Sequence, residues 1–253
     1  MSIETLRIAL VSTPRSGNTW LRLILGDIYE LEHFAVHSPD DLNFDKLPKR
    51  CIVQLHWQRS AEFIEYLKKY GFIIVTIGRH PLDVLISILQ FCTREPQTAF
   101  WLCGEGGDER GIVGKTPLDT EFLNYAKSSR ASNLLSVTCD WWNFSTARIQ
   151  YEDMLAEPEY ALSLFVNNIA APVNDIASSV RKYRFDQLKS SASNGHYWQG
   201  KCGIWERVLP LNYALDIFEC HRPIFDTLGY PVSAIRLEDE VYLSNWRKLM
   251  EVA

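Results

Sequence analysis

The sequence lacks the features that would place it in a membrane, in a secreted disulfide scaffold or around a metal. No apolar run approaches the roughly 20 residues that span a bilayer, and the short apolar stretch at residues 6–11 has no signal-peptide flanks. The six cysteines are scattered and form no CxxC pair, and no His/Cys cluster has the spacing of zinc ligands. We therefore predict a cytoplasmic protein without a transmembrane segment, with free thiols and no bound metal.

The chain also has no excess of basic charge. It holds 26 Lys and Arg against 31 Asp and Glu, a formal net charge of −5, whereas a general nucleic-acid binder is normally basic. We expect no nucleic-acid partner. A local anion pocket is still compatible with this balance, because net charge does not fix where the basic side chains lie.

Internal repeats, low-complexity tracts and an obvious linker are likewise lacking. With 47% hydrophobic and 23% charged residues, the composition is that of an ordinary globular protein rather than a disordered or fibrous one. The 253 residues suffice for a full hydrophobic core. We predict a single domain spanning residues 1–253, for which a homodimer stays open.

Hydrophobic patterning predicts strands and helices in alternation. Continuous apolar runs are typical of buried strands, and apolar residues at helical spacing indicate amphipathic helices. The predicted strands are 5–12, 51–55, 72–77 and 147–150, and the predicted helices are 18–30, 60–69, one beginning at Pro81, 120–142, 156–170, 174–182 and 213–228. This order favours an α/β fold with a central parallel sheet flanked by helices.

The segment STPRSGNTW, residues 12–20, joins the first predicted strand to the next helix and has the character of an anion-binding loop. Gly17 lets the backbone approach an anion closely, and amides at a helix start point toward it. Arg15 adds a cation and a two-pronged donor. The alternative is an ordinary strand-to-helix turn with a capping Ser or Asn.

A second segment, IIVTIGRHPLDVLIS at residues 73–87, repeats this layout. Arg79 follows a buried strand, where ligands bind in open parallel sheets, and Ser87 lies about two turns into the next helix. Together they could hold a second phosphate; the alternative is an exposed Arg and a surface Ser.

The pair of segments resembles the sulfotransferases that use 3'-phosphoadenosine 5'-phosphosulfate (PAPS) and release 3'-phosphoadenosine 5'-phosphate (PAP). In that family the 5'-phosphosulfate loop, which is P-loop-like, reads like TYPKSGTTW and the 3'-phosphate element like RNPKDVAVS, against STPRSGNTW and RHPLDVLIS here. Further similar segments follow in the family's order: DWWNFSTARIQYEDM at 140–154, GKCGIW at 200–205 and LGY at 228–230. The resemblance covers nearly the whole chain.

The resemblance implies a role for each matching position on the donor side. Arg15 lies at the position of the catalytic Lys, and Trp20 would stack on adenine. Tyr151 and Phe185 would contact the nucleoside. The residues implied to bind phosphate groups are Ser16, Gly17, Asn18 and Thr19 for the 5'-phosphosulfate, and Arg79, Ser87, Gly200 and Lys201 for the 3'-phosphate.

On the acceptor side, the LHW at residues 55–57 resembles the strand end that carries the family's catalytic base. His56 would therefore take the proton of an acceptor hydroxyl, with an amine also open; His33 and His37 are the alternatives. The acceptor could be a small molecule, a glycan or a lipid. Trp101, Phe100, Tyr197 and Trp198 would form an aromatic acceptor surface or simply pack their loops.

Three features depart from the family's pattern. Arg15 replaces Lys; it stays cationic but cannot shift its pKa as Lys does. Trp198, Gln199 and Gly200 stand where RKG is usual, so that Lys201 would have to supply the missing cation. Gln54 replaces a Lys two residues before the base.

Two other readings stay open. A P-loop-like small-molecule kinase would use similar loops, but the GxxxxGK[ST] pattern and a clear magnesium carboxylate are missing. A non-catalytic nucleotide-binding protein would keep both anion sites without a working base.

Overall fold

The computed structural model describes residues 4–36, 42–101, 109–184, 187–188, 198–233 and 236–251. These fall into two compact units, each built from two stretches of chain. The first comprises Met1–Arg79 and Ser136–Ser190, and the second His80–Leu135 and Ser191–Ala253. That residues 1–253 form one domain stays a prediction.

The first unit is built on a five-stranded sheet of order β2-β3-β1-β4-β5, in which every described pairing is parallel. Its register aligns Val11 with Leu55 and Leu10 with Val75. The strands are β1 (Leu6–Val11), β2 (Glu32–Ala35), β3 (Arg50–Leu55), β4 (Phe72–Gly78) and β5 (Ala147–Gln150). The predicted α/β class with a central parallel sheet is confirmed.

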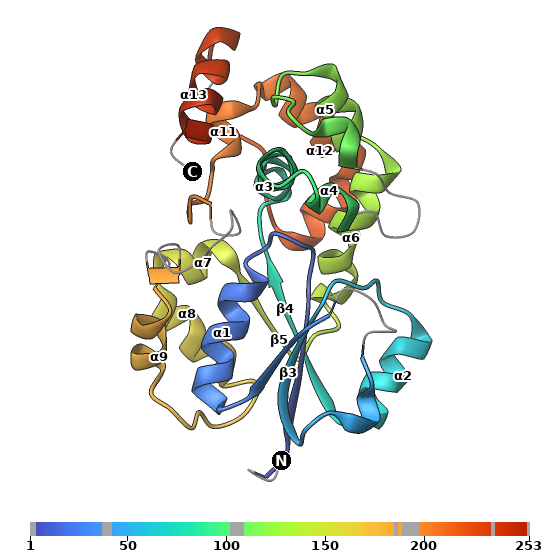
Figure 1. The fold of residues 1–253 in the computed structure, drawn as a ribbon, viewed down its shortest axis with the longest axis vertical. Coiled ribbons are helices and arrows are strands. Elements are labelled where there is room, and N and C mark those ends of the chain that lie inside the picture. The colour runs from blue at the N-terminus through green and yellow to red at the C-terminus, as the bar shows by residue number, and fades with distance from the viewer. Residues whose placement is uncertain are drawn as a thin grey trace. The chain divides into compact units, whose positions relative to one another are not determined.

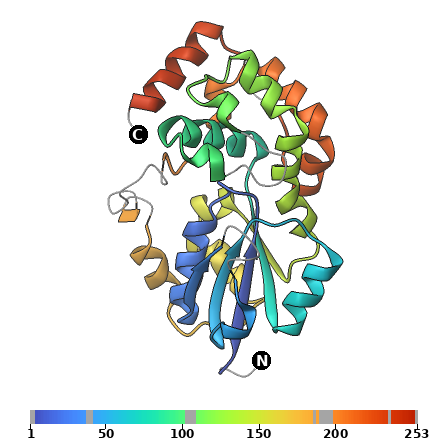
Figure 2. The same ribbon diagram turned by 45° about the vertical axis from the view of Figure 1, so that its right-hand side comes forward.

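Helices cover the two faces of this sheet (Figures 1 and 2), and a hydrophobic cluster lies on each face. Alternate residues of β1 divide between them: Leu6, Ile8 and Leu10 belong to one cluster, and Ala9 and Val11 to the other. The first face carries α1 (Asn18–Tyr29), α7 (Tyr151–Ala156), α8 (Pro158–Val166) and α9 (Ile176–Lys182); the second carries η2 (Phe44–Lys46), α2 (Ala61–Lys69) and the end of α6 (Ser129–Trp142).

The described part of the second unit is helical. It contains α3 (Pro81–Arg94), α4 (Thr98–Trp101), η3 (Glu109–Ile112), α5 (Thr120–Ala126), the start of α6, α11 (Trp205–Val208), α12 (Leu211–Leu228) and α13 (Asp239–Glu251). The buried Asp83 carboxylate accepts hydrogen bonds from the amides of Gly203 (2.7 Å) and Trp205 (3.0 Å), which ties α3 to α11. Within the described part of the chain, no helix is both long and apolar enough to cross a membrane.

Most predicted elements are confirmed, and the differences have local causes. The predicted helix 120–142 is divided into α5 and α6, because the Ser128 hydroxyl caps the start of α6 by accepting from Ala131 N. The predicted helix 156–170 is also wrong in its bounds: helix begins already at Tyr151 in α7, and α8 starts afresh with Pro158 in its first turn. The predicted stop at Gly229 is confirmed by its φ of 76°.

Candidate active site

The predicted site residues of the first unit follow the carboxyl ends of four adjacent strands. His56 follows β3, the loop that carries Arg15 and Gly17 follows β1, Arg79 follows β4, and Tyr151 directly follows β5. After β1 the chain continues to β2 and β3 on one side of the sheet, and after β4 it continues to β5 on the other side. The neighbouring strands β1 and β4 therefore form a topological switch point at their carboxyl ends. Ligands of open parallel sheets bind at such points.

Two side chains fix the start of the loop after β1. Ser12 is fully buried, and its hydroxyl accepts a hydrogen bond from the amide of Ile77 on β4 (2.9 Å). Thr13 and Thr138 bond reciprocally: each backbone amide donates to the other residue's hydroxyl, at 2.8 and 3.2 Å. The loop is therefore anchored both to the neighbouring strand and to α6.

Beyond Thr13 the loop makes two left-handed steps. Arg15 has φ 69° and Gly17 has φ 99°, while Ser16 and Asn18 are buried beside them. Gly17 is the N-cap of α1 and supplies no side-chain oxygen to its first turn. Asn18 donates from Nδ2 to Thr13 O (2.8 Å), and its buried Oδ1 has no partner. A helix start left without a side-chain cap suits an anion.

Arg79 joins this loop to Tyr151. Its guanidinium is buried, donates from Nη1 to Arg15 O (3.0 Å) and lies over the Tyr151 ring, 4.6 Å from the centroid. A Cβ at Gly17 would lie 2.6 Å from Tyr151 Cδ2, so the ring requires glycine there. Trp20 meets the same ring edge-to-face at 6.0 Å. The structure thus brings these five predicted residues together.

Trp20 itself is held at its edge. The indole Nε1 donates to Tyr183 O (2.8 Å), and the side chain is only 7% exposed. This fixes the ring plane between α1 and the end of α9. Its predicted stacking on adenine stays a prediction.

His56 has a defined tautomer. Its Nδ1 lies 2.7 Å from Ser12 O, and a carbonyl oxygen can only accept, so Nδ1 carries the hydrogen. Nε2 is then the acceptor atom of a neutral imidazole, and it faces the Gln54 amide nitrogen at 3.3 Å. A neutral imidazole with a directed lone pair has the chemistry of a general base.

The alternative histidines have other surroundings. Burial, followed by the charge of Arg22, lowers the pKa of His33. Its ring packs against α1, where a Cβ on Gly26 would lie 1.9 Å from His33 Cε1, so His33 fills space beneath the helix. His37 and the predicted adenine-side Phe185 lie outside the described residues.

Three predicted 3'-phosphate residues belong to the second unit. Ser87 is buried in α3, Gly200 has a left-handed φ of 59°, and Lys201 is exposed. Their roles stay predictions. Among the described residues, no three His, Cys, Asp or Glu side chains are grouped to hold a metal ion.

The predicted aromatic acceptor surface is described only in part. Phe100 is 57% exposed, whereas Trp198 is buried, packs edge-to-face on Trp246 and donates from Nε1 to Leu249 O (3.3 Å). Trp198 therefore packs against α13. Neither Tyr197 nor the side chain of Trp101 lies within the described part.

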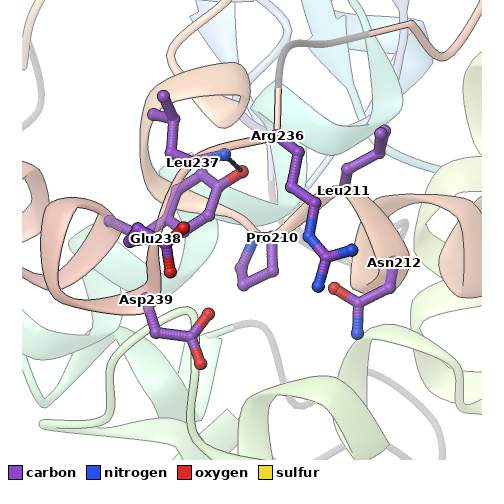
Figure 3. A pocket seen from close by; sticks show the side chains of 8 residues that line it. Pro210, Leu211, Asn212, Arg236, Leu237, Glu238 and Asp239 are labelled. Carbon is purple, nitrogen blue, oxygen red and sulfur yellow. Dashed lines mark hydrogen bonds between the residues drawn. The ribbon is translucent and has the colours of Figure 1, made fainter.

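A polar hollow of about 410 Å³ opens near the start of α12 in the second unit (Figure 3). Arg236 extends toward Asn212 on one side, and Glu238 and Asp239 lie on the other; the Tyr242 hydroxyl accepts from Leu237 N at 3.0 Å. None of the predicted site residues lines it.

Solved structures with the same fold are sulfotransferase-type proteins. The mouse sulfotransferase SULT7A1 complexed with PAP aligns with a TM-score of 0.66 and 18% identity, over 89% of this chain and 89% of that one. Retinol dehydratase in a complex with retinol and PAP aligns with a TM-score of 0.60 and 10% identity, over 87% of this chain and 81% of that one. No protein-family model and no curated protein sequence matches the chain. The chain therefore has the sulfotransferase fold.

Two features of the site were missed from the sequence. Thr138 is 125 residues away from Thr13, and nothing local marks the pairing. Arg22 donates from Nε to Gln54 Oε1 (3.1 Å), and Gln54 in turn contacts His56. Gln54 carried a signal that could have been used, since it is a polar residue among the apolar residues 51–55 of β3.

Proposed function

We propose that this protein is a PAPS-dependent sulfotransferase that transfers the sulfuryl group to a hydroxyl acceptor and releases PAP. One observation carries the proposal. The loop of Arg15 and Gly17, the guanidinium of Arg79 and the ring of Tyr151 meet at the switch point of the sheet, with the neutral His56 at the next strand end. The likeness to PAP-bound proteins of the same fold supports it.

The chain's residues suit an anionic nucleotide. The glycine-bearing loop leads into the start of α1, which no side chain caps. Arg15 and Arg79 supply cations, and a guanidinium binds phosphate with two directed donors. Trp20 and Tyr151 provide aromatic surface for the nucleoside. PAPS supplies an activated sulfuryl group on a good leaving group.

His56 and Arg15 have separate tasks in the proposed reaction. His56 Nε2 takes the proton of the acceptor hydroxyl as the oxygen attacks sulfur. Arg15 stabilises the negative charge that grows on the departing phosphate oxygen. As in phosphoryl transfer, the protein contributes mainly alignment and charge stabilisation.

The acceptor class is proposed from the fold likeness and from the base. A small apolar alcohol is the first class to test, because the retinol dehydratase structure holds retinol together with PAP. Amine, glycan and lipid acceptors, cytoplasmic location and a homodimer stay predictions.

The direct test incubates the protein with ³⁵S-labelled PAPS and a panel of hydroxylated acceptors, with EDTA present. We expect labelled product and no requirement for a divalent ion. A parallel reaction with ATP and Mg²⁺ should give no phosphorylated product. Activity that disappears in EDTA and returns with Mg²⁺ would favour the kinase reading, and PAP binding without transfer would favour a non-catalytic nucleotide-binding protein.

A further inference from the structure

Gln54 lies between a fixed cation and the proposed base. It is a buried polar residue of β3, paired in register with the apolar Leu10 of β1, so its side chain lies on the face covered by α1. The Gln54 amide oxygen accepts from Arg22 Nε (3.1 Å), and the amide nitrogen faces His56 Nε2 (3.3 Å). Both ends of the amide are therefore engaged.

The direction of this chain of hydrogen bonds follows from its two ends. Arg22 can only donate, so it holds the oxygen of Gln54 toward itself and directs the NH₂ group toward His56. At the other end, Ser12 O can only accept, so His56 keeps its hydrogen on Nδ1. A hydrogen on Nε2 would point at the NH₂ group of Gln54, donor against donor.

We propose that Gln54 is a positioning residue that keeps His56 neutral with its lone pair on Nε2, and that Arg22 sets its orientation. This rests on the proposed function in taking His56 as the base. The acceptor hydroxyl replaces the Gln54 NH₂ group as the donor to Nε2 and then gives up its proton there. The long 3.3 Å contact suits a partner that must be replaced in each turnover.

The substitution that tests this is Gln54→Glu. It keeps size and leaves an oxygen for Arg22, but it presents a carboxylate oxygen to His56 in place of the NH₂ donor. A carboxylate there favours hydrogen on Nε2 and blocks the base. We expect kcat to fall about 10- to 100-fold, with the Kd for PAP changed less than twofold. In ¹⁵N spectra of the full-length protein with PAP at pH 7, His56 Nε2 should change from an unprotonated to a protonated signal.

The matched control is Gln58→Glu, which adds the same charge two residues beyond His56 on an exposed side chain. It should leave both the ring signals and kcat unchanged. If Gln54→Glu fails to fold, Arg22→Met serves instead. It frees the amide to rotate, so that the Gln54 oxygen can face His56; Nε2 should then be partly protonated while Nδ1 keeps its hydrogen, and kcat should be lower.

The readouts separate the two proposals. Wild-type protein that transfers no sulfuryl group contradicts the proposed function, whatever the ring signals show. Active wild-type protein whose ring signals and kcat are unchanged by Gln54→Glu overturns the positioning role. A protonated Nε2 signal with unchanged kcat overturns it as well, because a free lone pair on Nε2 would then not matter to the reaction.

Discussion

At the residue scale, Gly17 is restricted both by its backbone and by its neighbours. Its φ of 99° is strained for any side chain, and a Cβ would collide with the Tyr151 ring. Gly17→Ala should therefore displace the loop that we propose binds the 5'-phosphosulfate, and weaken PAP binding at least tenfold by calorimetry. A left-handed φ alone costs an alanine about 1–2 kcal/mol.

Gly71→Ala is the matched control for Gly17→Ala. Gly71 lies in the same unit with φ 72°, but a Cβ there meets nothing within 4 Å. The Gly71→Ala variant should lose a similar amount of stability through backbone strain, and its affinity for PAP should be unchanged. Equal PAP binding by both variants would show that the collision with Tyr151 does not shape the nucleotide site.

His56 and Arg15 should respond differently to the acidity of the acceptor. His56→Ala should lower kcat by about 10²–10⁴ and leave PAP affinity nearly unchanged, because a general base acts only on the acceptor proton. Arg15→Ala should lower kcat and also weaken donor binding. An acceptor with a more acidic hydroxyl needs less help in losing its proton, so in steady-state assays it should partly rescue His56→Ala alone. Equal rescue of both variants would remove His56 from the role of base.

At the scale of elements, the sequence predicts best where burial dominates. Leu6–Val11 and Phe72–Gly78 are nearly continuous apolar runs, and both are central strands. The edge strand Glu32–Ala35 was missed because its side chains are mostly solvent-facing and it gains its place by pairing with β3. The helix Asp239–Glu251 was missed because only Tyr242 and Trp246 are buried along its length. Their spacing of four residues was the available signal.

The candidate site also has one part that was predictable from the sequence and one that was not. Both loops were predictable because Gly17, Arg15 and Arg79 follow recognisable strands. The contacts that join the two loops were not predictable. Arg79 contacts Arg15 O and the Tyr151 ring, and both contacts depend on the order of strands β1, β4 and β5. Sequence order alone does not state which strands are neighbours.

A buried ion pair links η3 to α6 within the second unit. Arg130 Nε donates to Glu109 Oε1 (2.7 Å), the Tyr125 hydroxyl donates to the same oxygen (3.3 Å), and Oε2 is buried without a partner. Arg130→Met should lower the free energy of unfolding by about 3–5 kcal/mol at pH 7, measured in urea, because it leaves the carboxylate buried and uncompensated. The exposed pair of Arg222 and Glu219 gives a control: Arg222→Met should cost below about 1 kcal/mol.

The loss of unfolding free energy caused by Arg130→Met should depend on pH in a defined direction. Burial raises the pKa of Glu109 above its ordinary value, and Arg130 opposes this, so the pKa rises further without Arg130. A carboxyl group with a raised folded-state pKa stabilises the fold when protonated and loses that contribution as the pH rises. The deficit should therefore shrink between pH 7 and pH 5. A deficit that grows on acidification would contradict this account of Glu109.

At the scale of the whole molecule, the two phosphate groups of PAP provide separate probes of the two segments that we propose bind them. The residues proposed to hold the 5'-phosphosulfate, Arg15 to Thr19, lie after β1, whereas Arg79 follows β4 and Ser87 lies in α3. A bound ligand suppresses local opening of the segments that it contacts, so amide hydrogen exchange can report each contact separately.

We expect PAP to slow amide exchange both in residues 12–20 and around Ser87 in α3. Adenosine 5'-monophosphate lacks the 3'-phosphate; at matched occupancy it should protect residues 12–20 and leave α3 close to its unliganded rate. Each charge-assisted hydrogen bond contributes about 1.5–3 kcal/mol, so PAP should also bind at least tenfold more tightly. Arg79→Ala should narrow this difference in affinity. Equal affinities, or protection of α3 by both ligands alike, would contradict the proposed 3'-phosphate roles of Arg79 and of Ser87 and would favour a nucleotide without that group.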